Sequence, residues 1–230
     1  MALAAKAAKE MDTRKRTVFI VDDHPLLRQG LALLINREND LTVCGEAEEA
    51  QTAMRAISQY QPDILIVDIS LNGPDGLDLL KNIRNSYPGL PVLILSMHDE
   101  ATYAERALRA RANGYIMKQE ATEKVLVAVR RILTGEVYLS DRIANKMLQQ
   151  YIGGASTALQ SRLNALSDRE LEVFRSIGEG RSTRQIADEL HLSVKTVETY
   201  QAHLKEKLAL RSGRELIQHA IQWKLNEGAA

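Results

Sequence analysis

The chain has 230 residues, enough for two domains, and its 45% hydrophobic and 26% charged residues match soluble globular proteins, which argues against wholesale disorder. Its 30 basic and 30 acidic residues cancel, which argues against a globally basic nucleic-acid binder but permits a local basic face. The single cysteine cannot form an internal disulfide, and no run of about eighteen apolar residues predicts a membrane span.

The N-terminal segment, residues 1–15, mixes alanine with lysine, arginine and acidic residues and offers few apolar anchors. We expect it to form a flexible tail outside the folded domains. It lacks the continuous apolar core of an export signal, so the sequence predicts a cytoplasmic protein that does not associate with membranes.

Residues 16–137 alternate short apolar runs with segments of helical spacing. The clearest run is Val18–Val21, and a continuous run of this length is typical of a strand buried on both faces, as in a parallel sheet. Similar runs occur at residues 41–46, 63–68, 91–96 and 114–118. Helical spacing is present at residues 26–37, 48–60, 77–86, 101–112 and 123–134. The alternation predicts an α/β domain, a doubly wound, five-stranded parallel sheet with helices on both faces.

Polar residues stand at the carboxyl ends of these strands, where doubly wound sheets form their functional crevice. They are Asp22, Asp23, Asp68, Ser96 and Lys118. Neighbouring carboxylates repel one another unless a cation lies among them, and hard oxygen ligands favour Mg²⁺. A carboxylate beside Mg²⁺ can attack a phosphoryl group, and Asp68 is our candidate nucleophile. Each residue alone also has a structural interpretation, since Asp23, for example, would N-cap a helix that begins His24-Pro25.

The strand pattern ends past Gly135. Residues 137–160 are predicted as a helix followed by a flexible linker at Gly153–Thr157, so the domain boundary is expected within residues 138–160. Residues 161–227 contain only helical segments, at 168–177, 183–190, 194–208 and 213–223. We therefore predict a second, small all-α domain of four helices.

Segments 183–190 and 194–208 match the two helices and tight turn of a helix-turn-helix. Ser193 would N-cap the second helix, whose exposed side would then enter the major groove of DNA. The predicted DNA contacts are Lys195, Thr196, Glu198, Thr199, Ala202, His203, Lys205 and Lys207. A helical hairpin in any small bundle looks similar, so this spacing alone leaves a role without DNA open.

Residues 17 to about 135 resemble the receiver domain of bacterial two-component response regulators of the NarL/FixJ type, on the strength of the opening Val18–Pro25, which contains Asp22-Asp23-His24-Pro25. The resemblance implies a flavodoxin-like receiver in which Asp68 accepts a phosphoryl group from a partner histidine kinase. It implies that Mg²⁺ is held by Asp22, Asp23, Asp68 and the backbone carbonyl of Ser70. Ser96 and Lys118 would bind the phosphoryl oxygens, and Tyr115 would be the aromatic switch residue.

Two positions depart from the receiver pattern. Many receivers carry proline after the lysine, often with a cis peptide, whereas Gln119 follows Lys118 here, and a non-proline cis bond is costly. Met97 follows Ser96 where a small residue is common, and we expect its bulk to restrict water and slow hydrolysis of the acyl phosphate.

The second domain resembles the LuxR-type DNA-binding domain over Leu166 to about Ala220, through Leu166–Glu170, Gly180–Ala187 and Leu192–Tyr200. The resemblance implies that residues 194–208 form the recognition helix and that the last helix, ending near Trp223, contributes to dimerisation on a two-fold DNA site. Tyr200 stands where histidine is frequent and can still serve as a phosphate contact.

Together these features predict a phosphorylation-controlled, DNA-binding transcriptional regulator that is a homodimer when phosphorylated and not a conventional enzyme. The unphosphorylated receiver would cover the recognition helix, and phosphorylation would release or dimerise the second domain. One alternative is a regulator that binds DNA independently of phosphorylation. A second is an aspartyl-nucleophile phosphatase, but phosphatases of the haloacid-dehalogenase type place an acidic residue two positions after the nucleophile, where this chain has Ser70.

Overall fold

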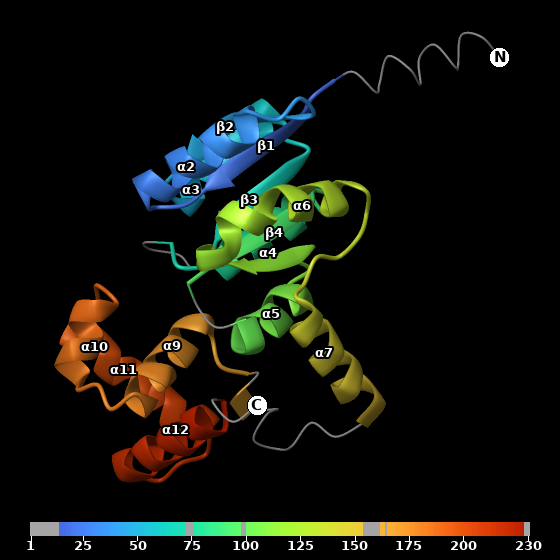
Figure 1. Cartoon of the computed structure of the whole chain (residues 1–230). Helices are drawn as coiled ribbons and strands as arrows, with labels where there is room; N and C mark the ends of the chain where they lie inside the picture. Colours follow the sequence, from blue (N-terminus) through green and yellow to red (C-terminus); the bar gives the residue numbers. More distant parts are fainter. Residues whose placement is uncertain (1–13, 72–75, 98–99, 154–161, 164, 228–230) are drawn as a thin grey trace, which may run out of the picture. The chain divides into compact units, whose positions relative to one another are not determined.

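The computed structural model describes residues 14–71, 76–97, 100–153, 162–163 and 165–227 (Figure 1). The chain divides into two compact units, residues 1–147 and 148–230, and each is described by itself. The predicted tail lies outside the described residues except for Arg14 and Lys15, and the predicted linker at Gly153–Thr157 lies outside them except for Gly153.

The N-terminal unit contains a five-stranded sheet in which every paired neighbour is parallel, in the order β2-β1-β3-β4-β5 (Figure 1). The predicted doubly wound sheet is therefore confirmed. Its strands are β1 (Arg16–Val21), β2 (Leu41–Ala47), β3 (Ile64–Asp68), β4 (Val92–Ser96) and β5 (Gly114–Met117). Its helices are α2 (Pro25–Asn36), α3 (Ala50–Tyr60), α4 (Gly76–Ser86), α5 (Glu100–Arg109) and α6 (Ala121–Leu133), with a short 3-10 turn at Lys118–Glu120. Helix α7 (Asp141–Gly153) begins in this unit and runs past its last residue, Met147.

Both faces of the sheet are buried, which explains why its strands are continuous apolar runs in the sequence. Side chains alternate between the faces, so Val18 and Ile20 of β1 join a core that includes Leu31 of α2 and Val129 of α6. Phe19 points the other way, and its ring lies 6.0 Å from that of Tyr60 in α3. The sheet is thus fixed from both sides, and its strand ends form a rigid edge.

The helix predicted from residue 137 begins four positions later, at Asp141, so the start of that prediction is wrong. Tyr138 instead forms an isolated parallel bridge with Gly114 of β5, where the Tyr115 amide donates to the Tyr138 carbonyl at 3.0 Å and the Tyr138 amide donates to the Asn113 carbonyl at 2.9 Å. Ser140 follows, and its hydroxyl and amide donate to the buried Glu100 carboxylate at 2.6 and 3.1 Å. Backbone amide and carbonyl groups at the edge of β5 need hydrogen-bond partners. The spacing of apolar residues, on which the helix was predicted, gives no sign of this pairing.

The C-terminal unit contains four described helices, as predicted: α9 (Asp168–Gly178), α10 (Thr183–Glu189), α11 (Val194–Lys207) and α12 (Gly213–Glu227). Serine side chains N-cap all four, Ser167 before α9, Ser182 before α10, Ser193 before α11 and Ser212 before α12. In the core, Phe174 of α9 lies 5.5 Å from the ring of Trp223 in α12. None of the helices in the described ranges is both long enough and apolar enough to cross a bilayer.

Glu170 joins two helices of this unit. Its buried carboxylate accepts the backbone amide of Ser167 at 2.7 Å and the ammonium of Lys207, at the end of α11, at 2.6 Å. Burial alone would raise the pKa of the Glu170 carboxyl, but the hydrogen bonds from Lys207 and Ser167 outweigh burial and hold that pKa below its usual value. The ionised carboxylate therefore stabilises the fold.

Replacing Glu170 by glutamine should lower the free energy of unfolding of this unit by about 2 kcal/mol at neutral pH, because a buried, charge-assisted interaction is lost. The pKa of the Glu170 carboxyl is lower in the folded than in the unfolded protein, where it is about 4.3. The difference in unfolding free energy between wild type and variant is therefore complete above pH about 4.3, and it disappears as the pH falls through the pKa of the folded state. Urea unfolding followed by the fluorescence of Trp223 measures this difference. The matched control is Glu189→Gln, which breaks only an exposed 3.8 Å pair with Arg181 and should change stability by less than about 0.5 kcal/mol.

Candidate functional site

Two strands of the N-terminal unit end in acidic residues that lie side by side. Asp22 and Asp23 follow β1, and Asp68 is the last residue of β3. Val21 of β1 pairs with Val67 of β3. The residues that follow them, Asp22 and Asp68, therefore lie at the same edge of the sheet. The carboxylates of both are buried. We call this edge, with Asp22, Asp23, Asp68 and Lys118, the acidic rim.

Lys118 brings a positive charge into the acidic rim. It follows β5, and its buried ammonium lies 2.7 Å from Asp68 Oδ2 and 2.9 Å from Asp22 Oδ2. The Lys118–Gln119 peptide is trans, as are all peptide bonds in the described segments. The lysine side chain therefore reaches both carboxylates without the cis bond that proline would favour at residue 119.

Burial is the main influence on the pKa of the Asp68 carboxyl. Burial raises the pKa of the Asp68 carboxyl, the ammonium of Lys118 lowers it, and the neighbouring Asp22 carboxylate raises it again. The net pKa lies above the usual value. An added cation would favour the ionised form of Asp68.

The acidic rim suits a divalent cation. One ligand atom from each of Asp22, Asp23, His24 and Asp68 lies within 4.8 Å of the others. Asp22 Oδ2 is buried and, among the described residues, accepts no hydrogen bond of good geometry, although the Lys118 ammonium lies near it. Carboxylate oxygens are the donors that Mg²⁺ prefers. Ser70 is also close, since its amide donates to Asp68 Oδ1 at 3.0 Å.

His24 lies beside the acidic rim and was not selected as a site residue from the sequence. Its Nδ1 atom lies 2.6 Å from Asp23 Oδ1 and 3.3 Å from Asp22 Oδ1. His24, and not Asp23, is the N-cap residue of α2, so the capping interpretation of Asp23 is wrong. The run Asp22-Asp23-His24 at a strand end was the available signal, because consecutive residues leaving a strand stay near its edge.

Arg28 is a second residue that sequence reasoning missed. Its largely buried guanidinium donates to the backbone carbonyl of Asp22 at 2.5 Å, to Glu46 at 3.0 Å and to Glu48 at 2.7 Å. It thereby ties the chain at the acidic pair to the end of β2. The two glutamates lie 18 and 20 residues farther along the chain, so no local sequence pattern predicts their contacts with Arg28.

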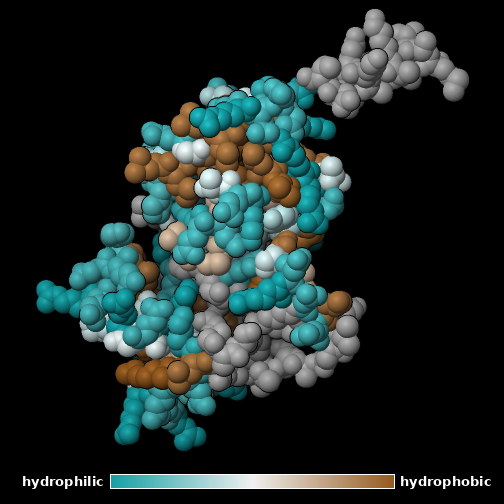
Figure 2. Space-filling model, in the orientation of Figure 1, coloured by the Kyte–Doolittle hydropathy of each residue, from teal (hydrophilic) through white to brown (hydrophobic). Residues whose placement is uncertain are grey.

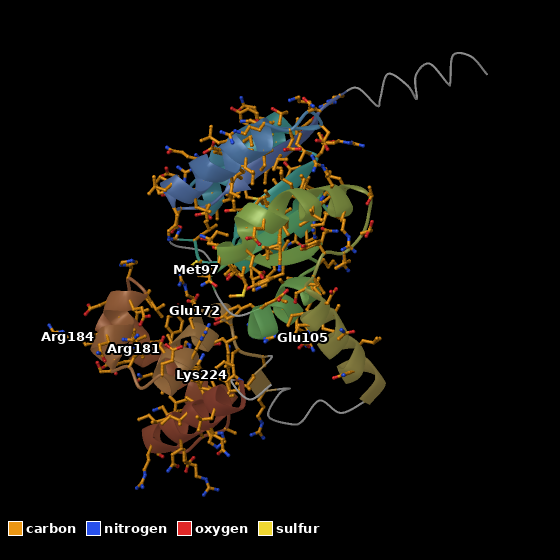
Figure 3. All side chains as sticks on the ribbon, in the orientation of Figure 1. Met97, Glu105, Glu172, Arg181, Arg184 and Lys224 are labelled. Atoms are coloured by element: carbon orange, nitrogen blue, oxygen red, sulfur yellow. The ribbon has the colours of Figure 1, made fainter. Side chains whose placement is uncertain are left out.

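Ser96 ends β4 and Tyr115 lies within β5, the two strands that follow β3 in the sheet. Ser96 is fully buried at the end of β4, and Tyr115 is buried opposite Ile94. Since Ser96 lies two positions beyond Ile94, Ser96 and Tyr115 point to the same face of the sheet. Met97, just beyond β4, is 54% exposed (Figure 3).

Gly76 at the start of α4 packs against the backbone of Asp68. Its amide donates to the Ile69 carbonyl at 3.0 Å, and a Cβ atom added to it would overlap with the carbonyl oxygen of Asp68. Only glycine allows this approach, so the position of the Asp68 backbone depends on the absence of a side chain at residue 76.

The C-terminal unit presents one polar face on α11. Val197, Leu204 and Leu208 are buried against the unit's core. The predicted DNA contacts Lys195, Glu198, Thr199, Ala202, His203 and Lys207 are exposed, while Thr196, Tyr200 and Lys205 are partly buried. The helix thus has the packed side and the free side that its sequence predicts.

Four of the predicted DNA contacts are already engaged within the unit, among them Thr199, whose hydroxyl donates to the Lys195 carbonyl at 3.0 Å. The ammonium of Lys207 binds Glu170, and His203 Nδ1 lies 3.6 Å from the same carboxylate. The Thr196 hydroxyl lies 2.7 Å from that of Ser193. Arg181 and Arg184, at the start of α10, are exposed cations that sequence reasoning did not select (Figure 3).

Comparison with known proteins gives a consistent result for both units. Residues 18–130 match the model of the response regulator receiver domain, and residues 164–220 match that of the bacterial regulatory proteins of the luxR family. The chain is 35% identical over 214 residues to the oxygen regulatory protein NreC of Staphylococcus aureus, covering 91% of this chain and 99% of NreC.

Two solved structures extend the comparison. A two-component response regulator of the LuxR family from Aurantimonas is 32% identical, with a TM-score of 0.56 over 60% of this chain and 99% of that protein. RcsB from Salmonella enterica serovar Typhimurium, bound to promoter P1flhDC in the presence of the phosphomimetic BeF3-, is 25% identical, with a TM-score of 0.59 over 90% of this chain and 98% of RcsB.

Substitution of Gly76 by alanine should destabilise the N-terminal unit by about 2 kcal/mol, because the new methyl group forces the Asp68 backbone to move. Gly30, within α2, is the matched control, since an added Cβ there has no neighbour within 4 Å. Gly30→Ala should stabilise the protein by about 0.5–1 kcal/mol through its better helix propensity. Thermal unfolding followed by circular dichroism compares the two variants, and equal stability of both would contradict the close approach.

Proposed function

Because this chain belongs to the two-component response regulators that join a receiver domain to a LuxR-type helix-turn-helix domain, we propose that it accepts a phosphoryl group on Asp68 and in response regulates transcription by binding DNA. The observation that carries the proposal is the buried Asp68 carboxylate, which shares the Lys118 ammonium with the Asp22 carboxylate. The protein is a regulator and not a conventional enzyme, and we expect it in the cytoplasm.

In the proposed reaction an oxygen of Asp68 attacks the phosphorus of a phosphohistidine on a partner kinase. An acyl phosphate forms, the nitrogen–phosphorus bond breaks, and the kinase histidine leaves with its nitrogen lone pair. Asp22, Asp23, Asp68 and the Ser70 carbonyl would hold Mg²⁺, which when bound supplies positive charge that neutralises the phosphoryl oxygens. Lys118, already 2.7 Å from Asp68, is positioned to move onto a phosphoryl oxygen.

The partner that donates the phosphoryl group must approach the acidic rim. Helix α2 begins at this edge, and Leu26 in its first turn is 85% exposed. In Figure 2 apolar side chains gather on the face of the N-terminal unit that carries α2. We therefore place the kinase contact on α2, with Leu26 next to the reacting groups.

The C-terminal unit supplies the DNA contact in this proposal. The exposed side of α11 offers Lys195 for phosphates and Glu198 and Thr199 for base edges. Arg184 of α10 adds a further exposed cation next to the recognition helix. Lys207 contributes to the stability of the unit through Glu170, which makes it a weaker candidate for a phosphate contact than Lys195.

We expect a random duplex library to yield a two-fold DNA site whose affinity rises about tenfold or more when acetyl phosphate and Mg²⁺ are added, since pairing two DNA-binding units raises effective concentration. Asp68→Ala should bind the same site but show no response to the phosphodonor.

Lys195→Ala should weaken binding evenly across sequences and reduce the salt dependence by about one phosphate contact. Selection followed by fluorescence anisotropy measures all three.

The outcomes separate the alternatives. Enrichment of one site with equal affinity in every condition would retain DNA binding and reject control by phosphorylation. Failure to enrich any site with a phosphorylated protein would reject the helix-turn-helix assignment. A response to the phosphodonor that persists in Asp68→Ala would move the phosphoacceptor away from Asp68.

The last helix carries an apolar stripe that suits the proposed homodimer. Ile217, Ile221 and Leu225 recur at helical spacing on α12 and are 49%, 41% and 70% exposed. Replacing Ile217 and Ile221 together by serine should abolish cooperative binding to the two-fold site and leave half-site affinity within about twofold, because these side chains are not core residues. Gln218→Ser, an exposed change on the same helix, is the control. Unchanged cooperativity in the double variant would contradict a role of α12 in dimerisation.

Met97 should prolong the lifetime of the acyl phosphate by covering it against water. We expect Met97→Ala to speed autodephosphorylation by roughly two- to fivefold, whereas Met97→Leu, which keeps the bulk, should leave the rate near that of wild type. Decay of radiolabelled phosphoprotein in Mg²⁺ buffer gives the rates. Equal lifetimes for the alanine and leucine variants would exclude shielding by residue 97.

A further inference from the structure

We propose that His24 is an additional ligand of the divalent cation at the acidic rim. Its imidazole increases the preference of the site for transition-metal ions such as Mn²⁺, Co²⁺ and Ni²⁺ over Mg²⁺, compared with a site made of carboxylates alone. The inference rests on the proposed function, because it concerns the same cation site. It assigns to His24 a role in choosing the metal.

The first support is the position of one ring nitrogen. His24 Nδ1 faces three carboxylates, at 2.6 Å from Asp23 Oδ1, 3.3 Å from Asp22 Oδ1 and 3.9 Å from Asp68 Oδ2. His24 belongs to the group of four residues whose ligand atoms lie within 4.8 Å of one another. A nitrogen donor therefore stands among the oxygen donors.

The second support is that the backbone presents His24 to the acidic rim. Its amide donates to Asp22 Oδ1 at 2.8 Å, and Pro25 follows at the first position of α2. The His24 side chain makes no capping hydrogen bond to the described backbone of that helix. With its ring 60% exposed and not needed as a cap, His24 can turn toward a cation at little cost to the fold.

The third support is a competition for the lone pair of Nδ1. The Lys118 ammonium, which can only donate, lies 3.3 Å from Nδ1, whereas the Asp23 carboxylate, which can only accept, lies 2.6 Å from it. Nδ1 cannot satisfy both, since it either carries the ring proton or offers a lone pair. With the proton on Nε2, a cation shared by Nδ1 and Asp23 removes the conflict.

The chemistry of the donor set gives the expected selectivity. Mg²⁺ binds oxygen and gains little from imidazole, whereas affinity for nitrogen-containing sites rises along the series Mn²⁺, Fe²⁺, Co²⁺, Ni²⁺. Removing the imidazole should therefore weaken the later ions of this series most and Mg²⁺ least.

Pulsed electron paramagnetic resonance of Mn²⁺ bound to the full chain tests direct ligation, because a coordinated imidazole nitrogen modulates the spin echo. We expect the nitrogen modulation in wild type and its loss in His24→Asn. His98→Asn is the matched control, since His98 lies two residues after Ser96 in the sequence, and it should retain the modulation. Modulation that persists in His24→Asn, or is lost only in His98→Asn, would overturn the inference.

Titration calorimetry with each ion alone tests the selectivity. We expect His24→Asn to lose about tenfold in Ni²⁺ affinity while its Mg²⁺ affinity changes less than about twofold. His24→Gln should repeat this result, and circular dichroism should show both variants folded. An equal loss for Ni²⁺ and Mg²⁺ would reject a ligand role that discriminates between metals.

A further variant separates this inference from the proposed function. Asp22→Asn should weaken every ion, because it removes a carboxylate on which the whole site depends. If Mg²⁺ binds wild type and Asp22→Asn equally, the cation site at the acidic rim fails and the His24 inference fails with it. If Asp22→Asn weakens Mg²⁺ but His24→Asn leaves the selectivity unchanged, only the role of His24 is rejected.

Discussion

The ion pair between Asp68 and Lys118 is the interaction around which the N-terminal unit is organised. Two carboxylates and one ammonium are buried together, and removing either sign would leave an uncompensated charge in the protein interior. Their meeting depends on the parallel register of β1 and β3 and on the position of β5 at the edge of the sheet. The hydrophobic strands therefore serve the site by fixing three strand ends relative to one another.

Neighbouring groups then adjust this charged centre. Arg28 holds the backbone at Asp22, Gly76 permits close packing behind Asp68, and His24 brings a nitrogen to its open side. Burial and the neighbouring Asp22 carboxylate raise the pKa of Asp68 further than the Lys118 ammonium lowers it. In the proposed function a cation and a phosphoryl group would each change the charge balance among the same few atoms.

Much of the fold and part of the site follow from local patterns in the sequence. Apolar runs ending in polar residues predicted the sheet, and the shared edge of parallel strands predicted that Asp22, Asp68 and Lys118 would be neighbours. Arg28 was missed because its partners Glu46 and Glu48 are distant in sequence. The bridge at Tyr138 was missed because its hydrogen bonds are made to the backbone of Asn113 and Tyr115, more than twenty residues earlier. The spacing of apolar residues carries no information about such contacts.

That bridge also determines where the receiver can be cut. The match to the receiver family ends at residue 130, yet the backbone of β5 is paired through Tyr138, and Glu100 holds Ser140. A fragment that stops at the family boundary would leave amide and carbonyl groups of Asn113 and Tyr115 open on an edge strand. Open strand edges recruit other chains, so we expect a receiver that retains the residues just past the family boundary to aggregate less than one cut at residue 130.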